Sequence, residues 1–154
     1  MIVDHPDDLA AHMSTPAVKK ATIYGSQRLR VAKTMRITNE SGTEFSANIT
    51  EFDSFHQYGF ADESGHFDHW GAGHLYTFPN EGSAQGIVVI QPGDLIALPY
   101  NRFVTEAIRL EIRDGFIRKI EGDGLDARMM RNWLDKNRTG PDDIDGYAIS
   151  HIGW

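Results

Sequence analysis

The residues most able to do chemistry in this 154-residue sequence gather in the stretch 69–86 and near the C-terminus. The stretch places His74 directly after Gly73 and before the aromatic run Leu75–Phe78. Glycine lets a backbone come close to a ligand, and a short strand gives a histidine a rigid mount. We therefore expect His74 to face a metal ion or a substrate, with His151 as the second anchor of that site.

A carboxylate would complete a metal-binding set with these two histidines. Glu63 and Glu81 are the candidates, and Glu81 lies in the predicted turn 79–82. Two histidines and one carboxylate form the facial triad that holds non-heme Fe(II), but the same set also suits hydrolytic zinc chemistry. A lone histidine on a strand is more often a structural residue than a ligand. The residues alone leave oxygen chemistry, hydrolysis and a structural role open.

The stretch 51–73 is the least regular part of the chain and is rich in histidine, acidic and aromatic residues. The triplet His66-Phe67-Asp68 has metal-binding residue types, but in a loop this spacing gives no fixed geometry. Taken together with the aromatic side chains, these residues have the composition of a ligand-pocket wall. We expect this stretch to line the site that His74 faces.

Composition excludes several classes of function. The net charge is −7 and the basic residues are scattered, so neither nucleic acid nor an anionic membrane is an expected partner. The absence of cysteine means that His, Asp or Glu must hold any metal. The apolar runs are too short to cross a bilayer and the N-terminus is acidic, which predicts a cytoplasmic protein. The chain lacks a nucleophile elbow, a phosphate-binding loop and a dinucleotide fingerprint.

Periodicity predicts an α+β fold in one domain over residues 1–154, with a largely antiparallel sheet built from hairpins. Gly42 and the pair Asp114-Gly115 mark two of the hairpin turns. The predicted elements are N-terminal helices at 3–13 and 16–33, hairpins at 35–39 with 43–49, 86–90 with 95–99 and 107–112 with 116–120, an amphipathic helix at 125–137, and a final strand at 147–154 that carries His151.

A succession of short motifs carries a resemblance to a known family. The motifs are S-G-T-E-F at 41–45, H-W-G-A-G-H-L-Y-T-F-P-N-E-G-S-A-Q-G at 69–86, P-G-D at 92–94, G-D-G-L-D-A at 122–127 and S-H-I-G-W at 150–154. In this order and spacing they resemble the 2,5-dihydroxypyridine 5,6-dioxygenase family. That family is similar in fold to the aminopeptidase T-like metallopeptidases.

The resemblance implies a role for each candidate residue. Where the peptidases carry carboxylate metal ligands, this chain has His74 and His151. A carboxylate can bridge two metal ions whereas a neutral imidazole binds one, so the exchange favours a single Fe(II) over a two-metal hydrolase. His151 is the implied iron ligand, and His74 and Glu63 are the implied catalytic residues in or near the pocket. The implied substrate pocket comprises Trp70, Tyr76, Glu81 and Trp154.

The implied activity is that of a mononuclear, extradiol-type dioxygenase of nicotinate degradation. Its partners would be dioxygen and 2,5-dihydroxypyridine or a similar hydroxylated N-heterocycle, and a homo-oligomer is expected. The family's further ligands come from a His-x-Asp motif downstream of the position of His151, and here the pattern occurs only upstream of it, at 5–7 and 66–68. We therefore expect this chain to be part of a larger metalloenzyme domain. An aminopeptidase-like hydrolase and a non-catalytic fragment are the alternatives.

Overall fold

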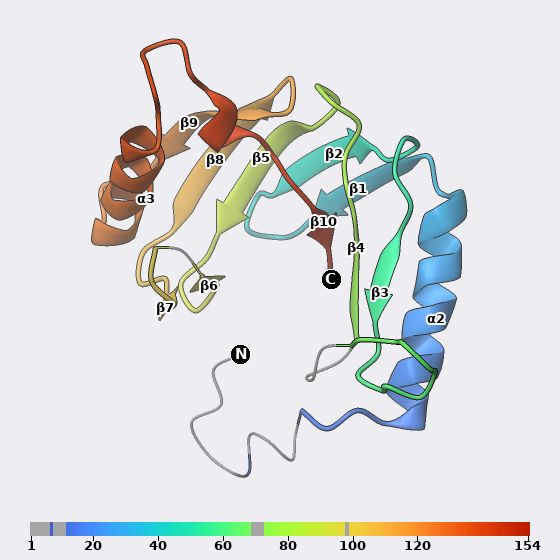
Figure 1. The fold of residues 1–154 in the computed structure, drawn as a ribbon. Coiled ribbons are helices and arrows are strands. Elements are labelled where there is room, and N and C mark those ends of the chain that lie inside the picture. The colour runs from blue at the N-terminus through green and yellow to red at the C-terminus, as the bar shows by residue number, and fades with distance from the viewer. Residues whose placement is uncertain (1–6, 8–11, 69–72, 98) are drawn as a thin grey trace. The chain divides into compact units, whose positions relative to one another are not determined.

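A computed structural model describes residues 7, 12–68, 73–97 and 99–154 (Figure 1). Its contacts divide the chain into two compact units, one made of residues 1–33, 49–78 and 151–154, and the other of residues 34–48 and 79–150. Helices and mostly antiparallel sheets occur together, so the predicted α+β class is confirmed. That residues 1–154 form one domain stays a prediction.

The first unit consists of helix α2 (Pro16–Val31) and a three-stranded antiparallel sheet in the order β10-β4-β3. The strands are β3 (Phe55–Gln57), β4 (His74–Thr77) and β10 (Ile152–Gly153), and α2 runs beside β3 and β4 in Figure 1. Most of the helix predicted at 3–13 lies outside the described residues.

Helix α2 begins where the sequence predicts. The Thr15 hydroxyl caps it by accepting a hydrogen bond from the Val18 backbone N–H at 3.2 Å, and Pro16 occupies the first turn. The helix continues through Gly25, and this glycine lets the helix lie close to β4. A Cβ at Gly25 would overlap the Cδ1 atom of Leu75. This contact holds the helix against the strand that carries His74.

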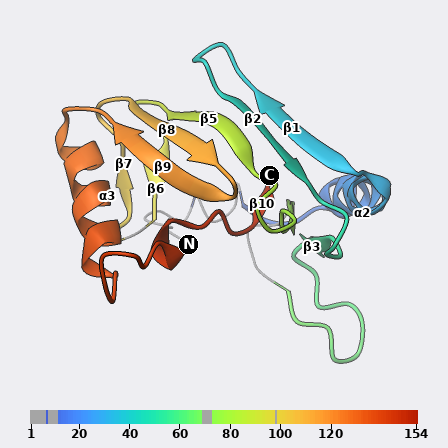
Figure 2. The same cartoon turned by 90° about the horizontal axis from the view of Figure 1, so that it is seen from above.

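The second unit is built on a five-stranded antiparallel sheet in the order β1-β2-β5-β8-β9 (Figure 2). The strands are β1 (Thr34–Thr38), β2 (Glu44–Asn48), β5 (Gln85–Ile90), β8 (Ile108–Arg113) and β9 (Phe116–Glu121). The hairpins predicted around Gly42 and Asp114-Gly115 are confirmed, and all three turn residues have positive φ angles, of 98°, 52° and 81°.

The predicted hairpin between 86–90 and 95–99 is wrong. The turn forms, with the Asp94 N–H donating to the Gln91 carbonyl at 3.0 Å. However, both edges of β5 are occupied, by β2 and β8. The segment after the turn, β6 (Leu95–Ile96), instead pairs with β7 (Arg102–Phe103).

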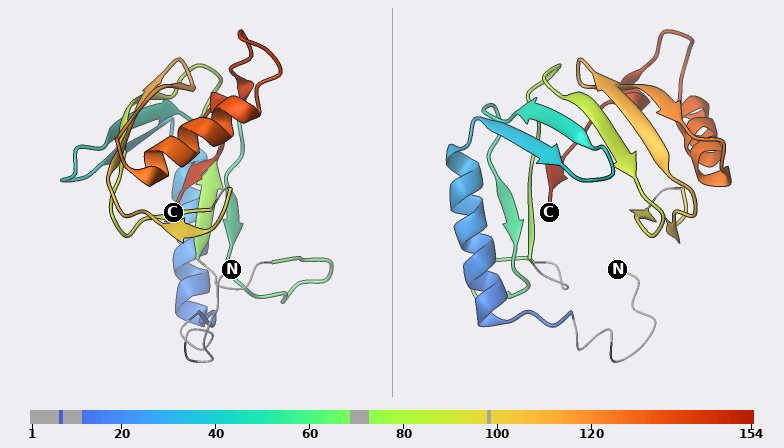
Figure 3. Two further views of the ribbon diagram at one scale, coloured as in Figure 1. Left: turned by 90° about the vertical axis from the view of Figure 1, so that its left-hand side faces the viewer. Right: turned by 180° about the vertical axis from the view of Figure 1, so that it is seen from behind.

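Helix α3 (Leu125–Lys136) confirms the predicted amphipathic helix and lies at the β9 end of this sheet (Figure 3). Its Ala127 joins Val104, Ile108 and Leu110 in a buried apolar core. The final strand is shorter than predicted: a 3-10 turn covers Asp145–Tyr147, and only Ile152–Gly153 are strand residues. In the described part of the chain, no helix combines the length and the apolar character that crossing a bilayer requires.

Candidate functional site

Strand β4 has half-buried side chains on one side and buried side chains on the other. His74 and Tyr76 are half-buried, whereas the alternate residues Leu75 and Thr77 are buried. This alternation follows from the period of two of a β-strand. The His74 and Tyr76 rings stack with their centroids 5.0 Å apart and their planes 25° from parallel. The side chains able to do chemistry therefore share one side of the strand.

Strand β10 brings His151 to the same side of β4. Ile152 pairs with Thr77 and Gly153 pairs with Tyr76, so the residue before them reaches the ring of Tyr76. The His151 ring stands edge-on to Tyr76 at 5.4 Å between centroids and to His74 at 6.4 Å. The structure thus brings together the two histidines that the sequence singles out, although they lie at distant positions in the chain.

Gly153 permits this arrangement. A Cβ at this position would overlap the carbonyl oxygen of Leu75, so only glycine lets β10 come this close to β4. The pairing is closed by two backbone hydrogen bonds between Leu75 and Trp154, at 2.7 and 2.9 Å. The glycine of the C-terminal motif therefore has a structural role in placing His151.

Two aromatic residues extend this surface. Phe55 of β3 stacks on Tyr76 at 5.2 Å, and Phe78 lies edge-on to Tyr76 at 6.1 Å and to His151 at 6.3 Å. We call the set Phe55, His74, Tyr76, Phe78 and His151 the histidine–aromatic face. Flat aromatic rings beside imidazoles can bind a planar heterocycle by stacking and can exchange protons with its hydroxyl groups.

Sequence reasoning did not single out Gln57, which contacts His74 directly. These residues are cross-strand partners in the β3–β4 pair, and the Gln57 Oε1 atom lies 3.3 Å from Nδ1 of His74. Phe55 and Phe78 were also missed as site residues. The signal for Phe78 is its position two residues beyond Tyr76. The signal for Phe55 and Gln57 would have been the pairing of β3 with β4, which the irregular composition of 51–73 concealed.

The other predicted site residues have different surroundings. Trp154 is 63% exposed and lies on the opposite side of the sheet, where it lines a groove with Val18 and Ala21 of α2. Glu63 is exposed in a turn, where its carbonyl accepts the His66 N–H at 3.0 Å. Trp70 lies outside the described residues.

Glu81 belongs to the second unit rather than to the unit that carries the two histidines. It lines a cleft of about 430 Å³ whose wall also includes Asp114, Phe116 and Asp145. Glu81 therefore lines a concave surface other than the histidine–aromatic face, and its contribution to a substrate pocket stays a prediction.

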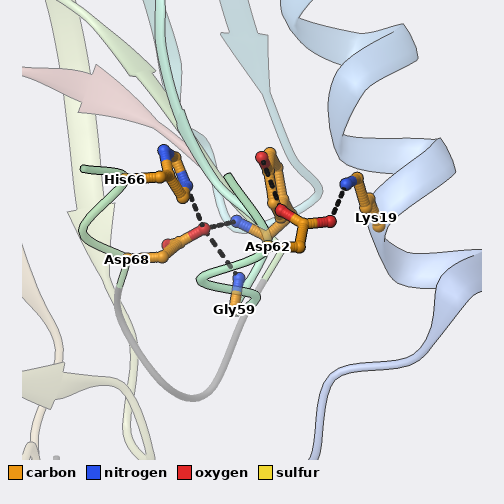
Figure 4. Close-up of polar contacts among 6 residues, drawn as sticks. Lys19, Gly59, Asp62, His66 and Asp68 are labelled. Carbon is orange, nitrogen blue, oxygen red and sulfur yellow. Dashed lines mark hydrogen bonds and ion pairs between the residues drawn. The ribbon is translucent and has the colours of Figure 1, made fainter. Parts of the chain in front are cut away.

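The His-x-Asp letters at 66–68 have a structural use in the loop that follows β3. The Asp68 carboxylate is 3% exposed and accepts the backbone N–H groups of Tyr58 and Gly59 at 2.9 and 3.0 Å (Figure 4). Nε2 of His66 lies 3.2 Å from the same oxygen. Asp68 thereby closes the loop 58–68 at its base.

A second contact ties this loop to α2. Lys19 forms an ion pair with Asp62, and its Nζ atom lies 4.5 Å from the centre of the Tyr58 ring (Figure 4). The hydrogen bond from Lys19 lowers the pKa of Asp62, and the same bond raises the pKa of Lys19. Burial, followed by the charge of Asp62, raises the pKa of Tyr58. The loop that carries Glu63 is therefore held at its base by Asp68 and near its middle by Lys19.

The possible metal-donor side chains show whether the described residues could hold a metal ion by themselves. Across residues 7, 12–68, 73–97 and 99–154, no three His, Asp or Glu side chains converge on one point. The histidine–aromatic face supplies two imidazoles, with ring centroids 6.4 Å apart, and no carboxylate. A mononuclear Fe(II) centre of the facial-triad type needs three donors. The described residues therefore do not fit a complete iron centre by themselves.

Comparison with known proteins connects this geometry to one family. A sequence model of the 2,5-dihydroxypyridine 5,6-dioxygenase family (NicX) matches residues 1–154. The 2,5-dihydroxypyridine 5,6-dioxygenase of Pseudomonas putida strain KT2440 is 36% identical over all 154 residues, and the chain spans 42% of that relative's length.

Solved structures agree with the sequence comparison. The structure of the dioxygenase from Pseudomonas putida KT2440 matches 99% of this chain and 42% of its own chain, with a TM-score of 0.84 and 36% identity. AmpT (aminopeptidase T) from Thermus thermophilus matches 96% of this chain and 34% of its own, with a TM-score of 0.58 and 16% identity, and shares the fold. The predicted resemblance is confirmed, and the chain belongs to the 2,5-dihydroxypyridine 5,6-dioxygenase family.

Proposed function

We propose that this chain forms part of a dioxygenase that opens the ring of 2,5-dihydroxypyridine, or a similar hydroxylated N-heterocycle, in nicotinate degradation. The observation that carries the proposal is the 36% identity to the Pseudomonas putida enzyme along the entire chain. The histidine–aromatic face supports it, because it combines flat rings with two imidazoles on one side of a sheet.

The proposed substrate surface is the ring of Tyr76 and its neighbours. Tyr76 is half-buried and its ring stacks on the rings of Phe55 and His74, which hold it in place. A pyridine ring that stacks beside it would bring its hydroxyl groups within reach of the imidazoles. Stacking of this kind orients a planar substrate and excludes water from one of its faces.

His74 is the proposed base. It is half-buried on a strand and contacts two neighbouring side chains, Gln57 and Tyr76, which restrict its ring. Removal of a hydroxyl proton makes the substrate ring electron-rich, which favours its reaction with oxygen. In the overall reaction the C5–C6 bond breaks and both atoms of dioxygen enter the product.

The proposed cofactor is Fe(II), with His151 as one of its ligands. His151 is an exposed imidazole at the edge of the histidine–aromatic face. Since the described residues do not complete an iron centre, the further metal donors would come from outside them. We also propose a cytoplasmic homo-oligomer.

Isotope labelling tests the proposed reaction. The proposed dioxygenase, of which this chain forms part, is incubated with Fe(II), 2,5-dihydroxypyridine and ¹⁸O₂, and the product is analysed by mass spectrometry. We expect a ring-opened product that carries two labelled oxygen atoms. Consumption of the pyridine with label taken only from water would contradict dioxygenase chemistry, as would cleavage of peptide substrates without use of the pyridine.

A further inference from the structure

We infer that Gln57 is a positioning residue for His74, an inference that rests on the proposed function of His74 as a base. The side-chain oxygen of Gln57 accepts a hydrogen bond from the Nδ1–H group of the imidazole. This bond holds His74 in the tautomer whose Nε2 atom carries the lone pair.

The two residues face each other by strand register. Gln57 and His74 are directly paired across β3 and β4, which places their side chains on the same side of the sheet. The Gln57 carbonyl is held nearby by the N–H of Gly73, at 3.0 Å, so the strands stay paired next to the contact. The 3.3 Å separation of Oε1 and Nδ1 follows from this pairing.

Two of the contacts of His74 bear on the orientation of its ring. Stacking on Tyr76, with planes 25° apart, sets the plane of the ring but does not distinguish its two edges. A histidine ring can turn about its second side-chain torsion, which has two broad minima. The contact with Gln57 selects the edge on which Nδ1 lies.

The chemistry of the partner selects the proton position. An amide oxygen can only accept a hydrogen bond, so the tautomer that we infer from the facing Oε1 atom carries its hydrogen on Nδ1. In a neutral imidazole the other nitrogen is then the acceptor. When Nε2 takes the substrate's hydroxyl proton, the imidazolium that forms keeps its Nδ1–H bond to Gln57. The contact therefore suits both states of the base.

The tautomer can be measured without any enzymatic activity. Long-range ¹H–¹⁵N spectra of the ¹⁵N-labelled chain at about pH 8.5, where a histidine of ordinary pKa is neutral, distinguish Nδ1–H from Nε2–H rings. His74 is assigned from the signal lost in His74→Gln. We expect the Nδ1–H tautomer in the unmodified chain. Gln57→Glu should keep it, because a carboxylate also only accepts hydrogen bonds, whereas Gln57→Leu should shift His74 toward the Nε2–H tautomer.

A matched control is Gln85→Leu, which removes an exposed strand glutamine from the other unit and should leave the His74 signals unchanged. Backbone amide spectra check folding. If Gln57→Leu does not fold, the unmodified chain and Gln57→Glu decide the question. An Nε2–H tautomer in the unmodified chain, or an unchanged tautomer in a folded Gln57→Leu, would overturn the inference.

Kinetics provide the functional readout. In an active preparation, Gln57→Leu should lower kcat by about tenfold, and Gln57→Glu should keep most of the unmodified kcat. A tenfold loss is the lower end of the losses seen when the orienting partner of a functional histidine is removed. The KM for the pyridine should change little, because Gln57 acts on the base. An inactive unmodified dioxygenase would count against the proposed function, whereas the tautomer measurement decides the role of Gln57 in either case.

Discussion

The edge of the His151 imidazole faces the ring of Tyr76, with the ring centroids 5.4 Å apart and the planes at 64°. This relationship depends on the short pairing of β10 with β4, which joins the end of the chain to its middle. It places a candidate metal ligand beside a candidate stacking surface. The proposed site therefore depends on both the aromatic character of position 76 and the exact pairing of β10.

Replacement of Tyr76 should separate stacking from the hydroxyl group. Tyr76→Leu removes a ring that stacks on Phe55 and His74, whereas Tyr76→Phe keeps the ring. Since an aromatic pair contributes about 0.5–1.5 kcal/mol beyond burial, we expect Tyr76→Leu to weaken pyridine binding by about threefold to tenfold. Anaerobic titration with the pyridine measures this. Equal affinities of the Leu and Phe variants would contradict a stacking role.

Gly153→Ala should displace His151 without touching it. The added methyl group would overlap the carbonyl oxygen of Leu75 on β4, so β10 must move away. We expect a loss of stability of about 1–3 kcal/mol, typical of overpacking, measured by urea unfolding. Activity should fall by roughly tenfold or more, because small displacements of reacting groups are costly.

Gly140→Ala is the matched control for Gly153→Ala. At Gly140 an added Cβ meets no atom within 4 Å, and its φ angle lies outside the range that disfavours other residues. This control should keep both stability and activity. If Gly153→Ala behaves like Gly140→Ala, the close approach of β10 to β4 has no functional importance.

The sequence predicts those parts of the site that depend on interactions between residues close in the chain. Alternation along β4 is local, so the shared side of His74 and Tyr76 follows from a period of two. The turn at Asp114-Gly115 is also local, and its hairpin is correctly predicted. The meeting of His151 with His74 was expected from the two residue types and from the resemblance, because no local pattern pairs residue 152 with residue 77.

Other features could not be predicted because they depend on which strand occupies each edge. The run 95–99 has the pattern of a hairpin strand, yet β5 already pairs with β2 and β8. A turn sequence does not show which strands compete for the edges of β5. Similarly, Trp154 follows His151 in the motif but lies on the α2 side of the sheet. Its orientation is set by the bonding of Trp154 to Leu75, a long-range pairing.

Acid should destabilise the second unit through Asp126, whose side chain is buried beside Arg102 at 2.7 Å. The backbone N–H of Thr105 donates a hydrogen bond to the Asp126 carboxylate, and this bond holds the pKa of Asp126 below its ordinary value of 3.8. Burial acts in the opposite direction and raises this pKa, whereas the Thr105 hydroxyl and the charge of Arg102 lower it further. Because the pKa is lower in the folded state, the charged group stabilises the fold above about pH 4, and this contribution is lost as pH falls through the folded-state pKa.

Asp126→Asn should therefore reduce the free energy of unfolding at pH 7 by roughly 2 kcal/mol, because it leaves a partly buried guanidinium without its counter-charge. The difference from the unmodified protein should begin to shrink below about pH 4, where Asp126 takes up a proton in the unfolded state. Chemical unfolding at a series of pH values measures this, with Asp123→Asn, an exposed neighbour, as the control. A difference that stays constant down to pH 3 would contradict the account.

We propose that the histidine–aromatic face serves an iron-dependent dioxygenase of which this chain forms part. Anaerobic titration of that dioxygenase with Fe(II), followed by oxygen uptake with 2,5-dihydroxypyridine, tests this proposal most directly. We predict saturable Fe(II) binding and pyridine-dependent oxygen uptake, both lost in His151→Ala and kept in His12→Ala, which changes an exposed histidine remote in sequence. Absence of iron binding and oxygen uptake in the unmodified dioxygenase, or their retention in His151→Ala, would contradict the proposal.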